Sequence, residues 1–209
     1  MRYPIFGIGQ AGKSVNITAQ NRINCYLDVQ PQEDKTQISL HARPGLNLFI
    51  DLGVDVVRGM IAVGDLLYVV QGTTFWEINS EGTATSRGSL TTGGGRVALA
   101  SNRGGEIMIT DGTSGYIYTI SSTSLAVISD SDYPDAATTV AYHDGYFIVE
   151  QPSSSIFHIS AIDDGTDWAG DTASGEKSPD ELVRVVDNTT EIILMGKESM
   201  ELWNNTGAA

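Results

Sequence analysis

The sequence predicts an all-β fold, a β-propeller or incomplete β-propeller of about four four-stranded antiparallel blades with an extended N-terminal arm. Two observations favour this fold. Short runs rich in Val, Ile, Tyr and Phe, bounded by Gly, Asn, Asp and Ser, recur along the chain, and such runs are typical of strands. A two-strand pattern also returns about every forty residues, which is a period of propeller blades and not of a sandwich.

Each repeat consists of an apolar strand, a short polar break and a second strand that carries an aromatic residue. These hairpins are expected at 66–79, 106–120, 145–160 and 191–204. A further strand precedes each hairpin, in "RGMIAV", "RVALAS", "TTVAYH" and "LVRVVD". Between repeats, "SRGSL" and "SLAVISD" have the composition of fourth, outer strands.

Two regions follow from this pattern. Residues 1–50 are expected to form the arm and a strand segment, and residues 51–209 are expected to form the blades, the last of them truncated. The sequence ends directly after the second strand of the last hairpin, which leads us to expect a fragment of a longer protein. Alternatively, the N-terminal segment supplies the missing strands and closes a small ring.

The charge balance bears on partners. The 209 residues include 26 acids and 12 bases, and no Lys or Arg occurs between Gly104 and Glu176. Because duplex DNA is held by Lys and Arg that displace counterions, specific DNA binding by this stretch is not expected. No apolar run approaches the length that spans a bilayer, and no signal peptide opens the chain, so we expect no membrane association and synthesis in a cytoplasm. The lone Cys25 excludes an internal disulfide.

The segment "GIGQAGKS" matches the phosphate-loop pattern from Gly7 to Ser14. A working phosphate loop needs a buried strand before it and a helix after it, because the helix N-terminus supplies much of the anion field. Pro4 weakens the preceding strand, and the residues after Ser14 are poor helix formers. We therefore predict no nucleotide and no other cofactor.

No catalytic or metal centre is predicted either. His41, His143 and His158 lie in different segments with no second ligand or triad member near them, and the last two are expected to face solvent or a blade edge. The acidic loop "DDGTDWAGD" departs from the spacing of a calcium loop. The protein is thus predicted not to be an enzyme.

The same loop contains a structural motif. Asp163, Gly165 and Trp168 resemble the Asp-box hairpin turn of sialidase-like propellers, with Ala161 in place of the usual serine. In that turn the aspartate binds backbone N–H groups and the tryptophan packs beneath it. An alternative function is a carbohydrate-binding or glycosidase-like propeller, with tryptophans as a sugar platform, although core packing of Trp76, Trp168 and Trp203 is the favoured interpretation.

Several stretches carry a family resemblance. "GQAGKSVNITAQNRINCYLDVQP", "LHARPGL", "ISAIDDGTDWAGDTASGEKSPDEL" and "ESMELWNNTGAA" are similar to the N-terminal half of the packaged-DNA stabilisation proteins, or tail accessory factors, of short-tailed bacteriophages. The resemblance implies a structural protein of the virion tail, made in the host bacterial cytoplasm. It implies a homo-oligomeric ring of six copies below the portal and adaptor that helps to retain DNA and to attach further tail proteins.

The acidity fits this role, because a conduit with a negative wall lets DNA pass without binding it. Flexible termini commonly become ordered on assembly, so we expect the arm and the following Pro-Gly turn to contact the neighbouring subunit or the adaptor. The residues expected to make these contacts are Tyr3, Lys13, Arg43, Pro44, Gly45 and Leu46.

Overall fold

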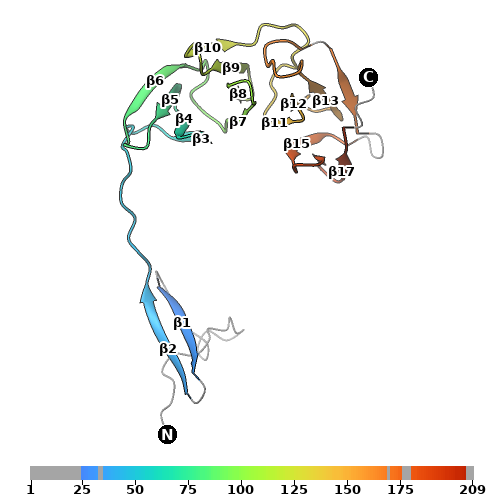
Figure 1. The fold of residues 1–209 in the computed structure, drawn as a ribbon. Helices are drawn as coiled ribbons and strands as arrows, with labels where there is room; N and C mark the ends of the chain where they lie inside the picture. Colours follow the sequence, from blue (N-terminus) through green and yellow to red (C-terminus); the bar gives the residue numbers. More distant parts are fainter. Residues whose placement is uncertain (1–24, 33–34, 169, 176–179, 206–209) are drawn as a thin grey trace. The chain divides into compact units, whose positions relative to one another are not determined.

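The computed structural model of the protein (Figure 1) describes residues 25–32, 35–168, 170–175 and 180–205. Contacts divide the chain into two units, Met1–Phe49 and Ile50–Ala209, which are described separately. In the described ranges, no helix is long and apolar enough to cross a membrane.

The described residues of the first unit form an antiparallel hairpin. Strand β1 (Cys25–Gln32) pairs with β2 (Lys35–Ala42) in a register that sets Tyr26 opposite His41. The rings of these two residues stack with their centroids 5.4 Å apart. An exposed segment without regular structure, 43–49, follows β2. The phosphate-loop match at 7–14 lies outside the described residues.

Where the structure describes the second unit, its strands form four antiparallel sheets and follow one another in chain order. Blade 1 is β3 (Val57–Val63), β4 (Leu66–Gln71), β5 (Thr74–Ile78) and β6 (Ala84–Ser89). Blade 2 is β7 (Ala98–Ser101), β8 (Glu106–Thr110), β9 (Gly115–Thr119) and β10 (Ser124–Val127). Blade 3 is β11 (Val140–His143), β12 (Tyr146–Glu150), β13 (Ile156–Ile159) and β14 (Thr172–Ser174). The described part of blade 4 is β15 (Leu182–Asp187), β16 (Ile192–Gly196) and β17 (Met200–Trp203).

These sheets confirm the predicted incomplete β-propeller. The first strand of each blade lies innermost: β3 contacts β7, β7 contacts β11, and β11 contacts β15. The fourth strands β6 and β10 lie on the outside of the row of blades (Figure 1). The four first strands therefore form an inner wall, a name used below for this surface.

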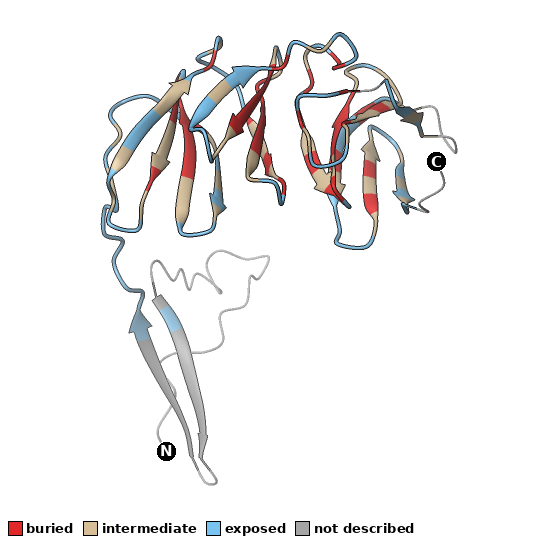
Figure 2. Ribbon diagram, turned by 45° about the horizontal axis from the view of Figure 1, so that its top comes forward, coloured by how far each residue is buried: buried red, intermediate tan, exposed pale blue. Residues whose placement is uncertain are grey.

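The core consists of three apolar layers, one between each pair of neighbouring blades, and these layers account for much of the buried chain in Figure 2. Tyr68 and Phe75 of blade 1 meet Tyr118 of blade 2, with ring centroids 5.6 and 5.1 Å apart. Aromatic pairs at such distances add stabilisation beyond their buried area. Each blade thus buries its faces against its neighbours, as the repeat predicts.

In each of the first three blades, a buried polar residue is the last residue of the second strand or directly follows it. Gln71, Asp111 and Glu150 occupy this position, and each accepts from or donates to the loop that leads into an inner strand. In blade 4 the equivalent residue is Gly196, and a Cβ there would overlap the carboxylate of Asp180. Asp180, in the loop that leads into β15, accepts hydrogen bonds from the backbone N–H groups of Glu198 and Ser199. In blade 4 the side chain that joins the loop to the second hairpin therefore comes from the loop and not from the strand end. These contacts between loop and hairpin are called polar clamps below.

His158 on β13 gives the stability a pH dependence. Its Nδ1 donates to the carbonyl of Asp132, 3.0 Å away, and burial lowers the pKa of the imidazole below its ordinary value of 6.5. A lowered folded-state pKa means that the unfolded chain binds the proton first as the pH falls, so stability is lost below pH 6.5. We expect the free energy of unfolding, measured in urea from about pH 7 to 5, to fall less steeply in His158→Gln than in the parent. An identical slope in the two proteins would contradict this prediction.

Candidate functional site

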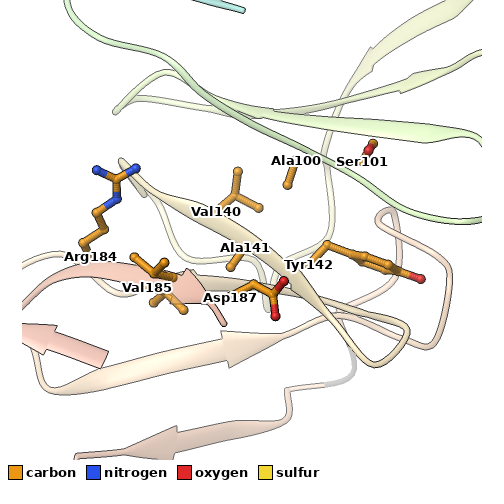
Figure 3. Close-up of a pocket in the computed structure, with 9 residues that line it drawn as sticks. Ala100, Ser101, Val140, Ala141, Tyr142, Arg184, Val185 and Asp187 are labelled. Carbon is orange, nitrogen blue, oxygen red and sulfur yellow. The ribbon is translucent and has the colours of Figure 1, made fainter. Parts of the chain in front are cut away.

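Two hollows on the inner wall are lined entirely by residues that the structure describes. The first, of about 380 Å³, is lined by β7, β11 and β15 and is called the β11 hollow (Figure 3). Arg184 and Tyr142 lie at its opposite ends, with Val140 and Ala141 between them. The second, of about 270 Å³, is lined by residues of β3, β7, β11 and β15 or next to them and is called the arginine hollow, after Arg58, Arg96 and Arg184. Both hollows are open to solvent, and both lie on the inner wall.

A histidine with two acidic neighbours lies beside the β11 hollow. Nδ1 of His143 is 2.7 Å from Oδ1 of Asp187, and its Nε2 is 3.3 Å from Oδ2 of Asp144. His143 is only 5% exposed, so the expectation that it faces solvent is wrong, although β11 is an edge strand of its sheet, as the other alternative had it. The reason is that the last residue of β11 turns toward blade 4, where Asp187 offers an acceptor. The described residues place no hydroxyl or thiol in hydrogen-bonding contact with this imidazole, and they contain no cluster of three or more possible metal ligands.

The Asp-box-like loop follows β13. Asp163 has a left-handed backbone (φ 52°) and accepts a hydrogen bond from the hydroxyl of Tyr142. Its neighbour Asp164 is the residue that accepts from a backbone N–H in the turn, that of Thr166 at 2.8 Å. The sequence pattern identifies Asp163, whereas the geometry gives the turn-forming role to Asp164. The two adjacent aspartates could not be distinguished from the sequence, because either can start such a turn.

Trp168 lies beneath this turn. Its Nε1 donates to the carbonyl of Gly165 at 2.9 Å, and its ring meets that of Tyr133 edge-on at 5.1 Å. With 1% of its surface exposed, Trp168 offers no platform for a sugar. Trp203 packs edge-on against Phe157, at 5.3 Å.

The loop is joined to blade 2. The N–H of Gly165 donates to Oε2 of Glu106 on β8 at 3.0 Å, and the side chain of Asn102 donates to the carbonyl of Asp163 at 3.1 Å. Gly165 itself lies so close to Phe147 and Ile117 that a Cβ would overlap them. The arrangement holds neighbouring blades together.

Sequence reasoning missed Arg58, which is 7% exposed. Its guanidinium donates to the carbonyls of Gly72, Thr92, Gly94 and Gly95 and to the hydroxyl of Thr92. The sequence shows only one arginine at the start of a strand, which is no signal for a buried role.

The residues predicted for assembly are placed in part. Tyr3 and Lys13 lie outside the described residues. Arg43, Pro44, Gly45 and Leu46 lie in the segment after β2, all exposed. Leu48 (80% exposed) and Phe49 (57%) continue the exposed apolar surface of this segment. Their role in assembly stays a prediction.

Among solved structures, the fold is similar to the computationally designed Ika4 protein (TM-score 0.55, 11% identity), over 77% of this chain and 99% of that one. The computationally designed Ika8 protein is similar over 85% of this chain and 57% of its own (TM-score 0.54, 11% identity). A chain of the mitotic checkpoint complex is similar over 68% of this chain and 45% of its own (TM-score 0.52, 13% identity). These likenesses show the fold alone.

The search of curated proteins found no match. The family model described as "Bacteriophage P22 Gp10, beta-propeller" matches residues 1–209. This match and the row of four antiparallel blades agree with the resemblance seen in the sequence. The chain therefore belongs to the phage stabilisation family, the β-propeller proteins that stabilise packaged DNA.

Proposed function

We propose that the protein is a non-enzymatic part of the phage tail that assembles as a ring of six copies below the portal and adaptor. There it helps to retain packaged DNA and to attach further tail proteins after its synthesis in the host cytoplasm. The observation that carries the proposal is the family match over residues 1–209, since this family is one of structural virion proteins.

The charge distribution supports a passive role toward DNA. Exposed carboxylates from blades 2 and 3, among them Asp132, Asp144 and Asp163, lie in the stretch that contains no Lys or Arg. A surface of this sign repels phosphates and lets a duplex slide past. Retention then comes from steric closure by the assembled tail.

Loss of DNA from particles tests this function. Phage particles assembled without the protein are expected to fill with DNA and then release it, measured as DNA that becomes accessible to nuclease. Adding back the protein during assembly should restore protection. Particles that keep their DNA without the protein would contradict the proposal.

The segment after β2 provides the assembly test. We expect the paired change Leu46→Ser and Leu48→Ser to weaken ring formation or adaptor binding by about tenfold or more, because exposed apolar side chains of this size contribute to interfaces when they become buried. The measurement is mass by light scattering across a concentration series, with and without adaptor.

Val127→Ser is the matched control, because Val127 on β10 is similarly apolar and 52% exposed. The control is expected to assemble like the parent. Unchanged assembly of the Leu46 and Leu48 variant would remove this segment from the set of contacts.

A further inference from the structure

Most cations in the described part of Ile50–Ala209 have partners. Arg87 forms an ion pair with Glu77 at 2.8 Å, and Lys197 forms one with Glu181 at 2.5 Å. Tyr142 and Asp163 lie close enough to Arg103 to raise the pKa of its guanidinium. The guanidinium of Arg58 donates its hydrogen bonds to loop carbonyls.

Arg96 and Arg184 differ from these cations. Neither forms an ion pair or a side-chain hydrogen bond with any described group, and both are exposed. In a chain with a net charge of −14, two arginines without a carboxylate partner are unexpected, because acidic side chains are abundant. Both line the arginine hollow.

The hollow is built from separate blades. Arg96 lies in the connection shortly before β7 of blade 2, Arg184 lies on β15 of blade 4, and Thr139 and Val140 of blade 3 also line the space. The register of β15 shifts between Leu182 and Arg184, and a bulge of this kind re-aims the side chain that follows it. The hollow therefore receives positive charge from two blades that are not adjacent in the chain.

The rest of the lining is apolar in part. Met60 and Leu99 join Val140 in the hollow. A glutamate or aspartate side chain fits this combination, because its carboxylate accepts paired hydrogen bonds from a guanidinium while its methylene groups contact aliphatic side chains. Arginine is also one of the residue types that contribute most of the binding energy in protein interfaces.

We propose that the arginine hollow is a binding site for an acidic peptide segment of a partner protein, with Arg96 and Arg184 as the residues that bind its carboxylates. Duplex DNA is a poorer occupant. A duplex requires a track of cations along its backbone, and the hollow offers two exposed arginines in a space of about 270 Å³. The site does not depend on ring formation, so it goes beyond the function proposed above.

The test uses the full chain labelled with ¹⁵N-arginine and follows the Nε–Hε signals. The probe is the capped peptide Gly-Glu-Glu-Glu-Gly, with Gly-Gln-Gln-Gln-Gly as the uncharged control and a short DNA duplex as the competing occupant. We expect the glutamate peptide to shift the signals of Arg96 and Arg184 saturably and the glutamine peptide to leave them unchanged. The paired change Arg96→Gln and Arg184→Gln should weaken binding by about tenfold or more.

Arg103→Gln is the matched control, since Arg103 is an exposed arginine outside the hollow. It should bind the glutamate peptide like the parent. The proposal is overturned if the glutamate peptide produces no saturable shift, if the glutamine peptide binds equally well, or if the duplex binds more tightly than the peptide through the same two arginines. Because the isolated chain is titrated, a failure here is distinct from a failure of DNA retention or ring assembly.

Discussion

Replacing Glu150 by alanine is expected to lower the free energy of unfolding by about 3–5 kcal/mol. Glu150 is 2% exposed and ends β12, and its carboxylate forms no ion pair with any residue that the structure describes. Its Oε1 accepts from the N–H and the hydroxyl of Thr138, both at 2.6 Å, and its Oε2 accepts from the N–H of Thr139 at 3.0 Å. Alanine leaves these part-buried donors without their acceptors, and a fully buried group left in this way costs about 1–3 kcal/mol.

The loss extends beyond blade 3. The hydroxyl of Thr139 donates to Glu150 and accepts from the N–H of Val185 on β15 at 3.3 Å. Glu150 therefore orients a hydroxyl that joins the loop before β11 to the inner strand of blade 4. We expect the alanine variant to loosen the contact between blades 3 and 4 as well as the loop itself.

Urea unfolding followed by tryptophan fluorescence measures the effect. Glu150→Gln keeps one acceptor oxygen and should cost less than alanine, about 1–2 kcal/mol. Glu81→Ala removes an exposed glutamate from the β5–β6 turn and should stay within about 0.5 kcal/mol of the parent. If Glu150→Ala also stayed within that range, the clamp would make no net contribution to stability.

The sequence predicted the blades because their signals are local. Each hairpin carries its own apolar strands and its own turn, and the period repeats that pattern, so the blade boundaries and the meander order could be derived without tertiary information. The pairing of β1 with β2 could not be derived in this way. The segment from Cys25 to Ala42 occurs once, so no repeat marks it as a hairpin.

The polar clamps between blades escaped prediction for a different reason. Gln71, Asp111 and Glu150 lie at or directly after the end of the second strand, whereas in blade 4 the carboxylate comes from Asp180, in the loop that leads into β15. A role filled by different residue types at different chain positions leaves no sequence pattern. His143 was misplaced because its partner Asp187 lies 44 positions away on another blade.

The candidate site on the inner wall could not be predicted from the sequence either. Arg96 and Arg184 are unremarkable in sequence, each a short distance from the start of a strand. Only the packing of β7, β11 and β15 brings both into the lining of one hollow. Family membership, in contrast, could be inferred from the sequence, because it depends on extended similarity and not on contacts between distant residues.

Replacing Arg58 by methionine is expected to lower the free energy of unfolding by about 2–4 kcal/mol. Methionine retains much of the aliphatic stem, so the change removes the guanidinium and little apolar contact. Nη1 donates to the carbonyl of Gly72 and Nε to that of Gly95, both at 2.9 Å, and Nη2 donates to the carbonyl of Gly94 at 2.6 Å. These carbonyls belong to a turn of blade 1 and to the connection that leads into blade 2, a glycine-rich stretch that has few side chains to hold it.

Arg58 is also linked to blade 2 by a chain of hydrogen bonds through Thr92 and Asp111. Its Nη2 donates to the hydroxyl of Thr92 at 2.9 Å, and that hydroxyl donates to Oδ2 of Asp111 at 2.5 Å. Asp111 in turn accepts from the N–H groups of Thr113 and Ser114 in the β8–β9 turn. The guanidinium therefore fixes the orientation of a hydroxyl on which a buried carboxylate depends, and its loss affects two blades.

Arg58→Lys distinguishes charge from geometry. An ammonium group keeps the charge but cannot reach carbonyls in several directions from one planar fork, so lysine should recover less than half of the loss. Arg103→Met removes an exposed arginine of blade 2 and should change the free energy of unfolding by less than about 0.5 kcal/mol. Full recovery by lysine would mean that the positive charge, and not the five hydrogen bonds, holds the connection between blades 1 and 2. Hydrogen exchange of the amides at 92–97 provides the local measurement, because loss of the clamp should increase exchange there before it affects the strands of either blade.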